Sequence, residues 1–88
     1  MPAFAFDPDK DRANLVKHGV SLARASELRM LAVQLDARFD YPEPRFRAWG
    51  PLDGLPHCLA FAVIDERLRA ISLRRAHLKE YRRYVPED

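Results

Sequence analysis

The distribution of apolar and polar residues over the first third of the chain predicts two short helices. Residues 8–18 are mostly polar with a narrow apolar stripe, a pattern typical of a helix on the protein surface. Both ends of this helix are marked, because Asp7 suits the N-cap, Pro8 the first helical position and Gly19 a left-handed stop. A second helix is predicted to follow at once, over about residues 22–29.

Beyond residue 30 the pattern favours β-strands, as alternating or short apolar segments. The predicted strands are residues 31–35, 45–50, 58–64 and 68–74, with a further short edge strand at residues 3–6. The third of these segments is the most apolar and should form the central strand. The predicted connections are an exposed polar loop at residues 36–44, a hairpin turn at the Asp53-Gly54 pair, and a tight turn at residues 65–67.

The chain closes with a basic segment, residues 76–84, that predicts a helix ended by Pro86. The whole order of elements therefore predicts an α+β fold in one domain over residues 1–88. It would contain two N-terminal helices, an antiparallel meandering sheet of about four strands, and a C-terminal basic helix.

The period of two divides the last predicted strand into two faces. The residues expected on one face are Arg69, Ile71, Leu73 and Arg75, and those on the other are Leu68, Ala70, Ser72 and Arg74. Ile71 and Leu73 should meet the helices. Ser72 and Arg74 should then face an open side of the sheet.

Charge is unevenly distributed along the chain. The net charge of the 88 residues is only +2, but the segment from Glu66 to Tyr84 holds seven basic and two acidic residues. Six of the seven are arginines, whose planar guanidinium matches a phosphate group in a bidentate manner. We therefore expect a partner that carries phosphate, or an acidic protein surface.

Composition excludes several classes of site. Cys58 is the single cysteine, so an internal disulfide is impossible and a reducing compartment is favoured. The three histidines are dispersed, and none has a cysteine or acid at a spacing suited to zinc. Three scattered glycines form no phosphate-binding loop. We expect a cytoplasmic protein with no cofactor, no metal site, no export signal and no membrane span.

Candidate chemistry concentrates in the basic tail. Glu80 is the single acid within it and suits either a structural ion pair or a base that removes a hydroxyl proton. His77 is the best placed histidine for proton transfer, and Tyr84 could stack on a base or simply pack. One basic stripe is predicted from Arg75, Lys79 and Arg82 or Arg83, opposite an apolar stripe of Leu78, Tyr81 and Val85. That stripe is either a solvated helix face or part of a phosphate-binding groove.

Three blocks of sequence, in order, carry a family resemblance. The first is FDPDK at residues 6–10 with Asn14 and KHGVS at residues 17–21; the second is DYPEPR at residues 40–45, running into Gly50; the third is ISLRRA at residues 71–76, followed by Glu80 and Tyr84. Together they resemble the BrnT family of bacterial toxins, ribonucleases of type II toxin–antitoxin systems with a RelE-like fold.

The resemblance implies a toxin that inhibits translation by metal-free RNA cleavage and is neutralised by a BrnA-like antitoxin. Operator DNA would be bound only through the antitoxin complex, and a homodimer or heterotetramer is possible. The resemblance implies a site that contains Arg45, Arg74, Glu80 and Tyr84, and the basic tail adds His77 to these candidate catalytic residues. The RNA-binding residues expected from the basic segment are Arg69, Arg75, Lys79, Arg82 and Arg83. Arg74 with Arg45 or Arg75 would stabilise phosphoryl charge, Glu80 would act as base, and His77 or Tyr84 as acid.

The sequence also leaves a rival interpretation open. Phe39 stands where the family commonly has histidine, and Arg75 where it commonly has lysine. The chain could therefore be a non-catalytic module whose basic tail docks an acidic partner or nucleic acid. A DNA-binding regulator ranks third, because the only basic helix is short and terminal.

Overall fold

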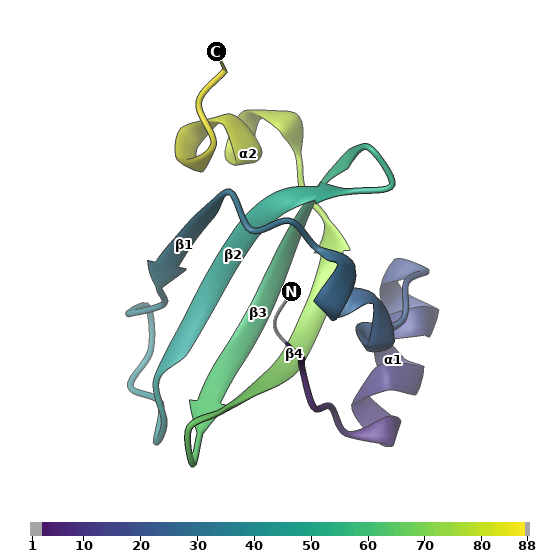
Figure 1. The fold of residues 1–88 in the computed structure, drawn as a ribbon, viewed down its shortest axis with the longest axis vertical. Coiled ribbons are helices and arrows are strands. Elements are labelled where there is room, and N and C mark those ends of the chain that lie inside the picture. The colour runs from purple at the N-terminus through teal and green to yellow at the C-terminus, as the bar shows by residue number, and fades with distance from the viewer. Residues whose placement is uncertain (1–2, 88) are drawn as a thin grey trace.

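The computed structural model describes residues 3–87, and its elements follow the predicted order (Figure 1). They are α1 (Pro8–His18), the 3₁₀ helix η1 (Leu22–Glu27), β1 (Ala32–Leu35), β2 (Arg45–Leu52), β3 (Leu55–Ile64), β4 (Arg67–Arg75) and α2 (Leu78–Tyr84). The α+β prediction is confirmed. Helices lie at both ends of the chain and a four-stranded sheet lies between them.

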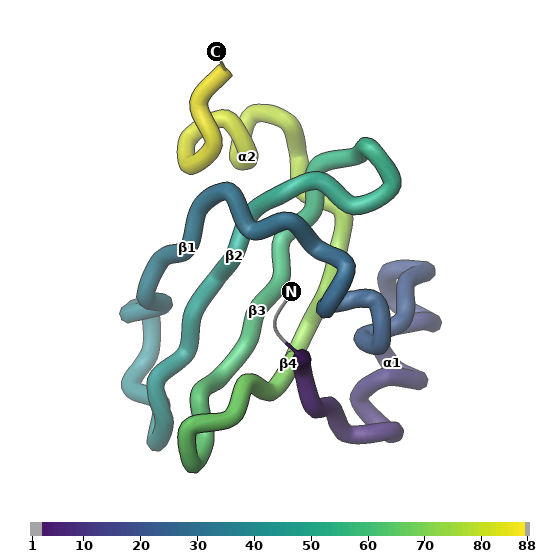
Figure 2. Tube along the Cα trace, viewed as in Figure 1, coloured from purple at the N-terminus to yellow at the C-terminus, as the bar shows by residue number. Residues whose placement is uncertain are grey.

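The sheet is an antiparallel meander in the order β1-β2-β3-β4, which the chain trace follows without a crossover (Figure 2). The β2–β3 turn has Asp53 and Gly54 at φ of 54° and 73°, and the β3–β4 turn has Asp65 and Glu66 at 50° and 63°. Two successive left-handed residues make the turn whose twist matches that of the flanking strands. Both tight connections were therefore predicted correctly.

The ends of α1 match their sequence signals. Asp7 accepts a hydrogen bond from the backbone N–H of Asp9, Pro8 occupies the first turn, and Gly19 adopts a left-handed φ of 73°. A glycine takes this conformation without the steric cost that a side chain would add. The predicted bounds of this helix are confirmed.

Two N-terminal predictions need correction. The second helix is a six-residue 3₁₀ helix rather than a helix that reaches residue 29, since Leu28 is already extended. After Leu28 the chain passes over β2 at Gly50. The carbonyl group of Arg29 lies so close to Gly50 that any residue with a Cβ at this position would clash with it. The predicted edge strand at residues 3–6 forms only one bridge, a parallel one between Ala5 and Arg69.

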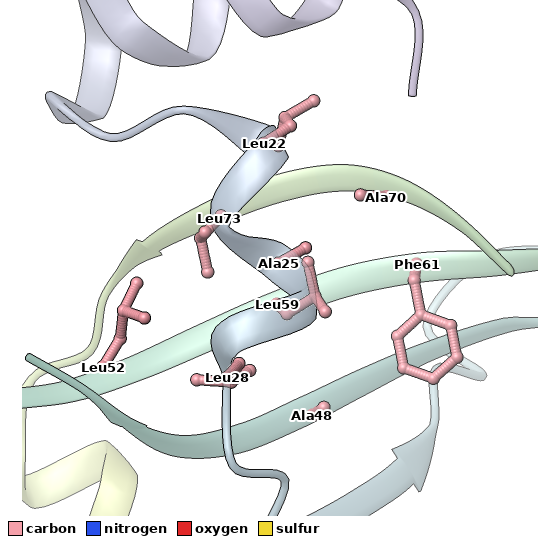
Figure 3. Packing of buried hydrophobic residues seen from close by; sticks show 9 residues of the cluster. All are labelled: Leu22, Ala25, Leu28, Ala48, Leu52, Leu59, Phe61, Ala70 and Leu73. Carbon is pink, nitrogen blue, oxygen red and sulfur yellow. The ribbon is translucent and has the colours of Figure 1, made fainter. Parts of the chain in front are cut away.

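The core lies on one side of the sheet, beneath η1 (Figure 3). Its buried residues are Leu22, Ala25 and Leu28 from η1 and the adjoining turn, with Ala48, Leu52, Leu59, Phe61, Ala70 and Leu73 from the strands. Burial of this apolar surface is the main source of stability in a chain with so few residues. We call this side of the sheet the covered face.

Asn14 fixes α1 against the outer edge of β4 (Figure 1). Its side-chain amide donates to the carbonyl oxygens of Val20 and Leu73, both at 2.8 Å, and accepts from the Leu73 N–H at 3.1 Å. The edge of β4 is thus paired at Leu73 by a buried side chain rather than by a further strand.

A β-bulge in β4 changes which residues share a face. Ser72 pairs with Ala60, but the next pair is Ala70 with Phe61, so Ile71 is an extra residue in β4. The predicted faces hold for Ser72 to Arg75 and are wrong for residues 68–70. The bulge turns Ala70 into the core beside Leu73 and moves Arg69 to the side of Arg74.

Candidate functional site

The side of the sheet opposite η1 carries a concentration of arginines. Three rows of paired residues cross it: Arg45, Ala62 and Arg69; then Arg47, Ala60 and Ser72; then Trp49, Cys58 and Arg74. Paired residues of antiparallel strands point to the same side, and the alanines of β3 keep the middle of this surface low. We call it the open face, defined by Arg45, Arg47, Arg69, Ser72 and Arg74.

Arg47 and Arg74 lie on either side of β3 in adjacent rows of the open face. Neighbouring strands lie about 4.8 Å apart, so roughly 10 Å separates their backbones across the sheet. Two arginine side chains extended toward each other across such a gap could hold one phosphate group between them.

Helix α2 borders the open face through an aromatic stack. The rings of Trp49 and Tyr84 lie 4.5 Å apart at an interplanar angle of 14°. Trp49 is fully buried, and Tyr81 and Val85 pack on the same cluster. The predicted apolar stripe of this helix is confirmed for Tyr81 and Val85 but wrong for Leu78, which is exposed at the first helical position.

The same helix brings Glu80 to Arg74. A guanidinium nitrogen of Arg74 lies 3.1 Å from a Glu80 carboxylate oxygen, and both side chains are 31% exposed. The ion pair joins the predicted base, Glu80, and a predicted charge-stabilising arginine, from two different elements. It also leaves both groups open to a ligand on the open face.

Arg45 and Arg47 are held by aromatic rings. The Arg45 guanidinium lies 4.2 Å from the centre of the Tyr41 ring, and that of Arg47 lies 5.5 Å and 5.6 Å from the Trp49 and Tyr84 rings. The Nε atoms of both arginines are buried and have no hydrogen-bond partner within residues 3–87. The ring contacts thus fix the orientation of both guanidinium groups.

The remaining predicted residues lie elsewhere. Arg75 pairs with His57 in a row that points to the covered side, so it is separated from Arg74 by the sheet. Lys79, Arg82 and Arg83 are exposed on the side of α2 away from the open face, and Arg82 pairs with Glu87 at 2.6 Å. The basic stripe that included Arg75 is therefore wrong, because Arg75 ends β4 and α2 begins only at Leu78.

His77 precedes α2 as its N-cap residue, is exposed, and makes no side-chain capping bond. Cys58 is buried beside Trp49 in the row of the open face nearest α2, and burial raises the pKa of its thiol to about 11. The thiol is therefore neutral at physiological pH and packs as a small apolar group.

Comparison with known proteins identifies the family. Residues 6–80 match the model of a family described as the ribonuclease toxin, BrnT, of type II toxin–antitoxin systems. The chain belongs to the BrnT family. Membership implies an RNA target and an antitoxin partner. No match was found among curated proteins.

The BrnT fold is also seen in a crystal structure of the ribonuclease toxin BrnT from Brucella abortus. That structure matches with a TM-score of 0.62 and 22% identity, over 88% of this chain and 99% of the other. The likeness confirms the predicted arrangement of sheet and helices. Within the part of the chain that the structure describes, no helix is long and apolar enough to cross a membrane.

Arg47 and Trp49 lie in the rows of the open face and were not among the residues predicted from the sequence. The signal was present, because Arg45, Arg47 and Trp49 alternate along one strand and must share a face.

A buried carboxylate lies at the border of the open face. Asp36, predicted as part of an exposed loop, has a side chain only 4% exposed. Its two oxygens accept hydrogen bonds from Nε and a terminal nitrogen of Arg38, both at 2.9 Å. These bonds, with a smaller contribution from the charge of Arg47, hold the pKa of Asp36 well below its usual range, although burial acts in the opposite direction.

This carboxylate predicts an acid-sensitive contribution to stability. A carboxyl with a lowered pKa in the folded state stabilises the fold above the pKa of the unfolded aspartate, about 3.9, and loses that effect as the pH falls further. We expect Asp36→Asn to lower the free energy of unfolding at pH 7 and to flatten its decline below about pH 4. Urea unfolding across that range measures both, with Asp40→Asn, an exposed aspartate of the same loop, as control. Equal pH dependence in the two variants would contradict the assignment.

Proposed function

We propose that this BrnT-family protein cleaves RNA on the open face without a metal ion. The observation that carries the proposal is the convergence of arginines from β2 and β4 on one side of the sheet, with Glu80 of α2 touching Arg74. A phosphodiester in cleavage gains negative charge on its oxygens, and fixed guanidinium groups stabilise that charge.

The proposed charge clamp consists of Arg74 and Arg47. They lie in adjacent rows across β3, whereas Arg45 and Arg69 lie in the row farthest from Arg74 and would contact neighbouring phosphates. Arg75 takes no part, because its side chain leaves the sheet on the covered side.

Cleavage requires two proton transfers. The RNA 2′-hydroxyl loses its proton to Glu80 and attacks the adjacent phosphorus, and the bond to the 5′ oxygen breaks as that oxygen receives a proton. Tyr84 is our preferred acid over His77, since it packs on Trp49 at the edge of the open face. The products are a 2′,3′-cyclic phosphate and a free 5′-hydroxyl.

The metal-free route assigns charge stabilisation to side chains. The charge that a metal ion would neutralise falls to the arginines of the open face.

The proposed partner is a BrnA-like antitoxin that blocks the open face in the cytoplasm. Operator DNA would be bound through the antitoxin part of the complex, as a heterotetramer or through a toxin homodimer. Neutralisation would then result from the exclusion of RNA from this face.

Incubation of the purified protein with RNA in the presence of EDTA tests the proposed reaction. We expect cleavage to persist in EDTA and to leave 2′,3′-cyclic phosphate ends, detected by enzymatic end analysis of the fragments. Cleavage that stops in EDTA and returns with Mg²⁺ would refute the metal-free mechanism. Binding of RNA without any cleavage would instead favour a non-catalytic module, for which Phe39, exposed beside Tyr41 in place of a histidine, is the supporting observation.

A further inference from the structure

A cavity of about 290 Å³ lies between α1 and β4, outside the clamp described above. One wall of the cavity is formed by α1, whose titratable lining residues are Lys10, Lys17 and His18. The opposite wall is formed by Ile71 and Ser72 of β4. Every charged side chain that lines it is basic, which makes it suitable for an anion.

The sequence of α1 builds this basic wall. Lys10, Asn14 and Lys17 are separated by four and three residues and therefore lie on one side of the helix. The hydrogen bonds of Asn14 to β4 and Val20 hold this side of the helix, which carries both lysines, against the strand.

The acidic residues of α1 are paired with groups other than Lys10 and Lys17. Asp9 pairs with Arg12, and Asp11 accepts hydrogen bonds from the Ser21 hydroxyl and the Leu22 N–H. Neither carboxylate neutralises the lysines of the cavity, so its positive potential is retained.

The cavity is continuous with the open face through β4. Ser72 lines the cavity and also belongs to the open face, one row from Arg74. Arg74 is near enough to contribute, after burial and Lys17, to lowering the pKa of His18. Two residues of strand span roughly 7 Å, comparable to the step between successive phosphates of an extended single strand.

We propose that this cavity binds a second phosphodiester of the same RNA strand, next to the scissile one held at Arg74. Lys10 and Lys17 supply the charge, and the Ser72 hydroxyl donates a hydrogen bond from the strand side. The inference rests on the proposed function and adds a substrate-binding site to it. The bulge at Ile71 places the wall of the cavity beside the open face.

Binding of a fully 2′-O-methylated single-stranded RNA tests this site, because the probe cannot be cleaved. We expect Lys10→Gln/Lys17→Gln to raise its Kd about tenfold, in line with the loss of charge-assisted phosphate contacts. The slope of log Kd against log salt concentration should decrease by about 0.7, because the variant makes one phosphate contact fewer. Fluorescence anisotropy at several salt concentrations provides both values.

The matched control is Arg29→Gln/Arg67→Gln, which removes the same charge from exposed residues that do not line the cavity, Arg67 lying at the opposite end of β4 from Arg74. An equal rise of Kd in both double variants, or no rise in the lysine variant, would overturn the proposal. So would unchanged RNA binding combined with lost antitoxin binding, since the cavity would then serve the antitoxin. Both lysines are exposed, and the single variant Lys17→Gln repeats the test if the double variant fails to fold.

Failure of the second phosphate site can be distinguished from failure of the proposed function. Absence of RNA cleavage by the unaltered protein would refute the proposed reaction while leaving the binding comparison interpretable. Normal cleavage with no effect of the lysine substitutions on Kd would refute the second phosphate site alone.

Discussion

Replacing Arg74 with alanine is expected to lower the single-turnover rate of RNA cleavage by roughly 10²- to 10³-fold, the cost of removing one preorganised donor to developing charge. Arg74 is the arginine that contacts Glu80, and it lies across β3 from Arg47. The loss should appear in the rate at saturating protein, measured by gel analysis of labelled RNA. Growth inhibition in cells should disappear while antitoxin binding remains.

The Arg74→Ala protein should remain folded. The Arg74 side chain is 31% exposed, and an ion pair at such exposure contributes at most about 1 kcal/mol. A urea unfolding midpoint close to that of the unaltered protein is therefore the control for this experiment. Full toxicity from a folded Arg74→Ala protein would contradict the proposed role.

Replacing Trp49 with alanine is expected to destabilise the fold by about 3–5 kcal/mol, the usual cost of truncating a fully buried large aromatic side chain. Trp49 has no exposed surface and supports Tyr84, Tyr81 and Val85 of the C-terminal segment. A small domain has about 5–15 kcal/mol of total stability, so a substantial part of it would be lost. Urea unfolding followed by circular dichroism measures the change.

The loss of stability on substitution of Trp49 should depend on whether the new residue keeps an aromatic ring. Trp49→Phe keeps an aromatic surface for Tyr84 and should lose much less stability than Trp49→Ala. Leu78→Ala, on the exposed start of α2, should have little effect and serves as the control for that helix. A Trp49→Ala protein with unchanged unfolding would mean that the stack with Tyr84 does not hold α2 to the sheet.

Features set by neighbouring residues were predictable from the sequence. The ends of α1 depend on Asp7, Pro8 and Gly19, and each acts through its own backbone preference or a bond two residues away. The Asp53-Gly54 turn is equally local. These signals need no knowledge of the rest of the fold, which is why they gave correct boundaries.

Features set by distant packing were not predictable in the same way. The bulge at Ile71 lets both Ala70 and Leu73 enter the core, and strict alternation along the sequence contains no sign of it. The early end of η1 depends on Gly50, a residue more than twenty positions away.

The residues of the candidate site also differ in how far the sequence predicts them. Arg74, Glu80 and Tyr84 were proposed from the family resemblance, and the fold brings them to one side of the sheet with Arg45. Arg75 is adjacent to Arg74 in sequence but emerges on the opposite side. Charge counts along the tail do not separate these two arginines, whereas the alternation of the last strand placed them on opposite faces and the pairing of β4 agrees with it.

The central claim is that RNA is cleaved on the open face, and a side-by-side measurement of Arg74→Ala and Arg75→Ala tests it most directly. Both variants lose one arginine from adjacent positions of β4, on opposite sides of the sheet. We predict single-turnover cleavage reduced by roughly 100-fold or more for Arg74→Ala and by less than about twofold for Arg75→Ala. Equal losses in the two proteins, or a larger loss for Arg75→Ala, would contradict the account.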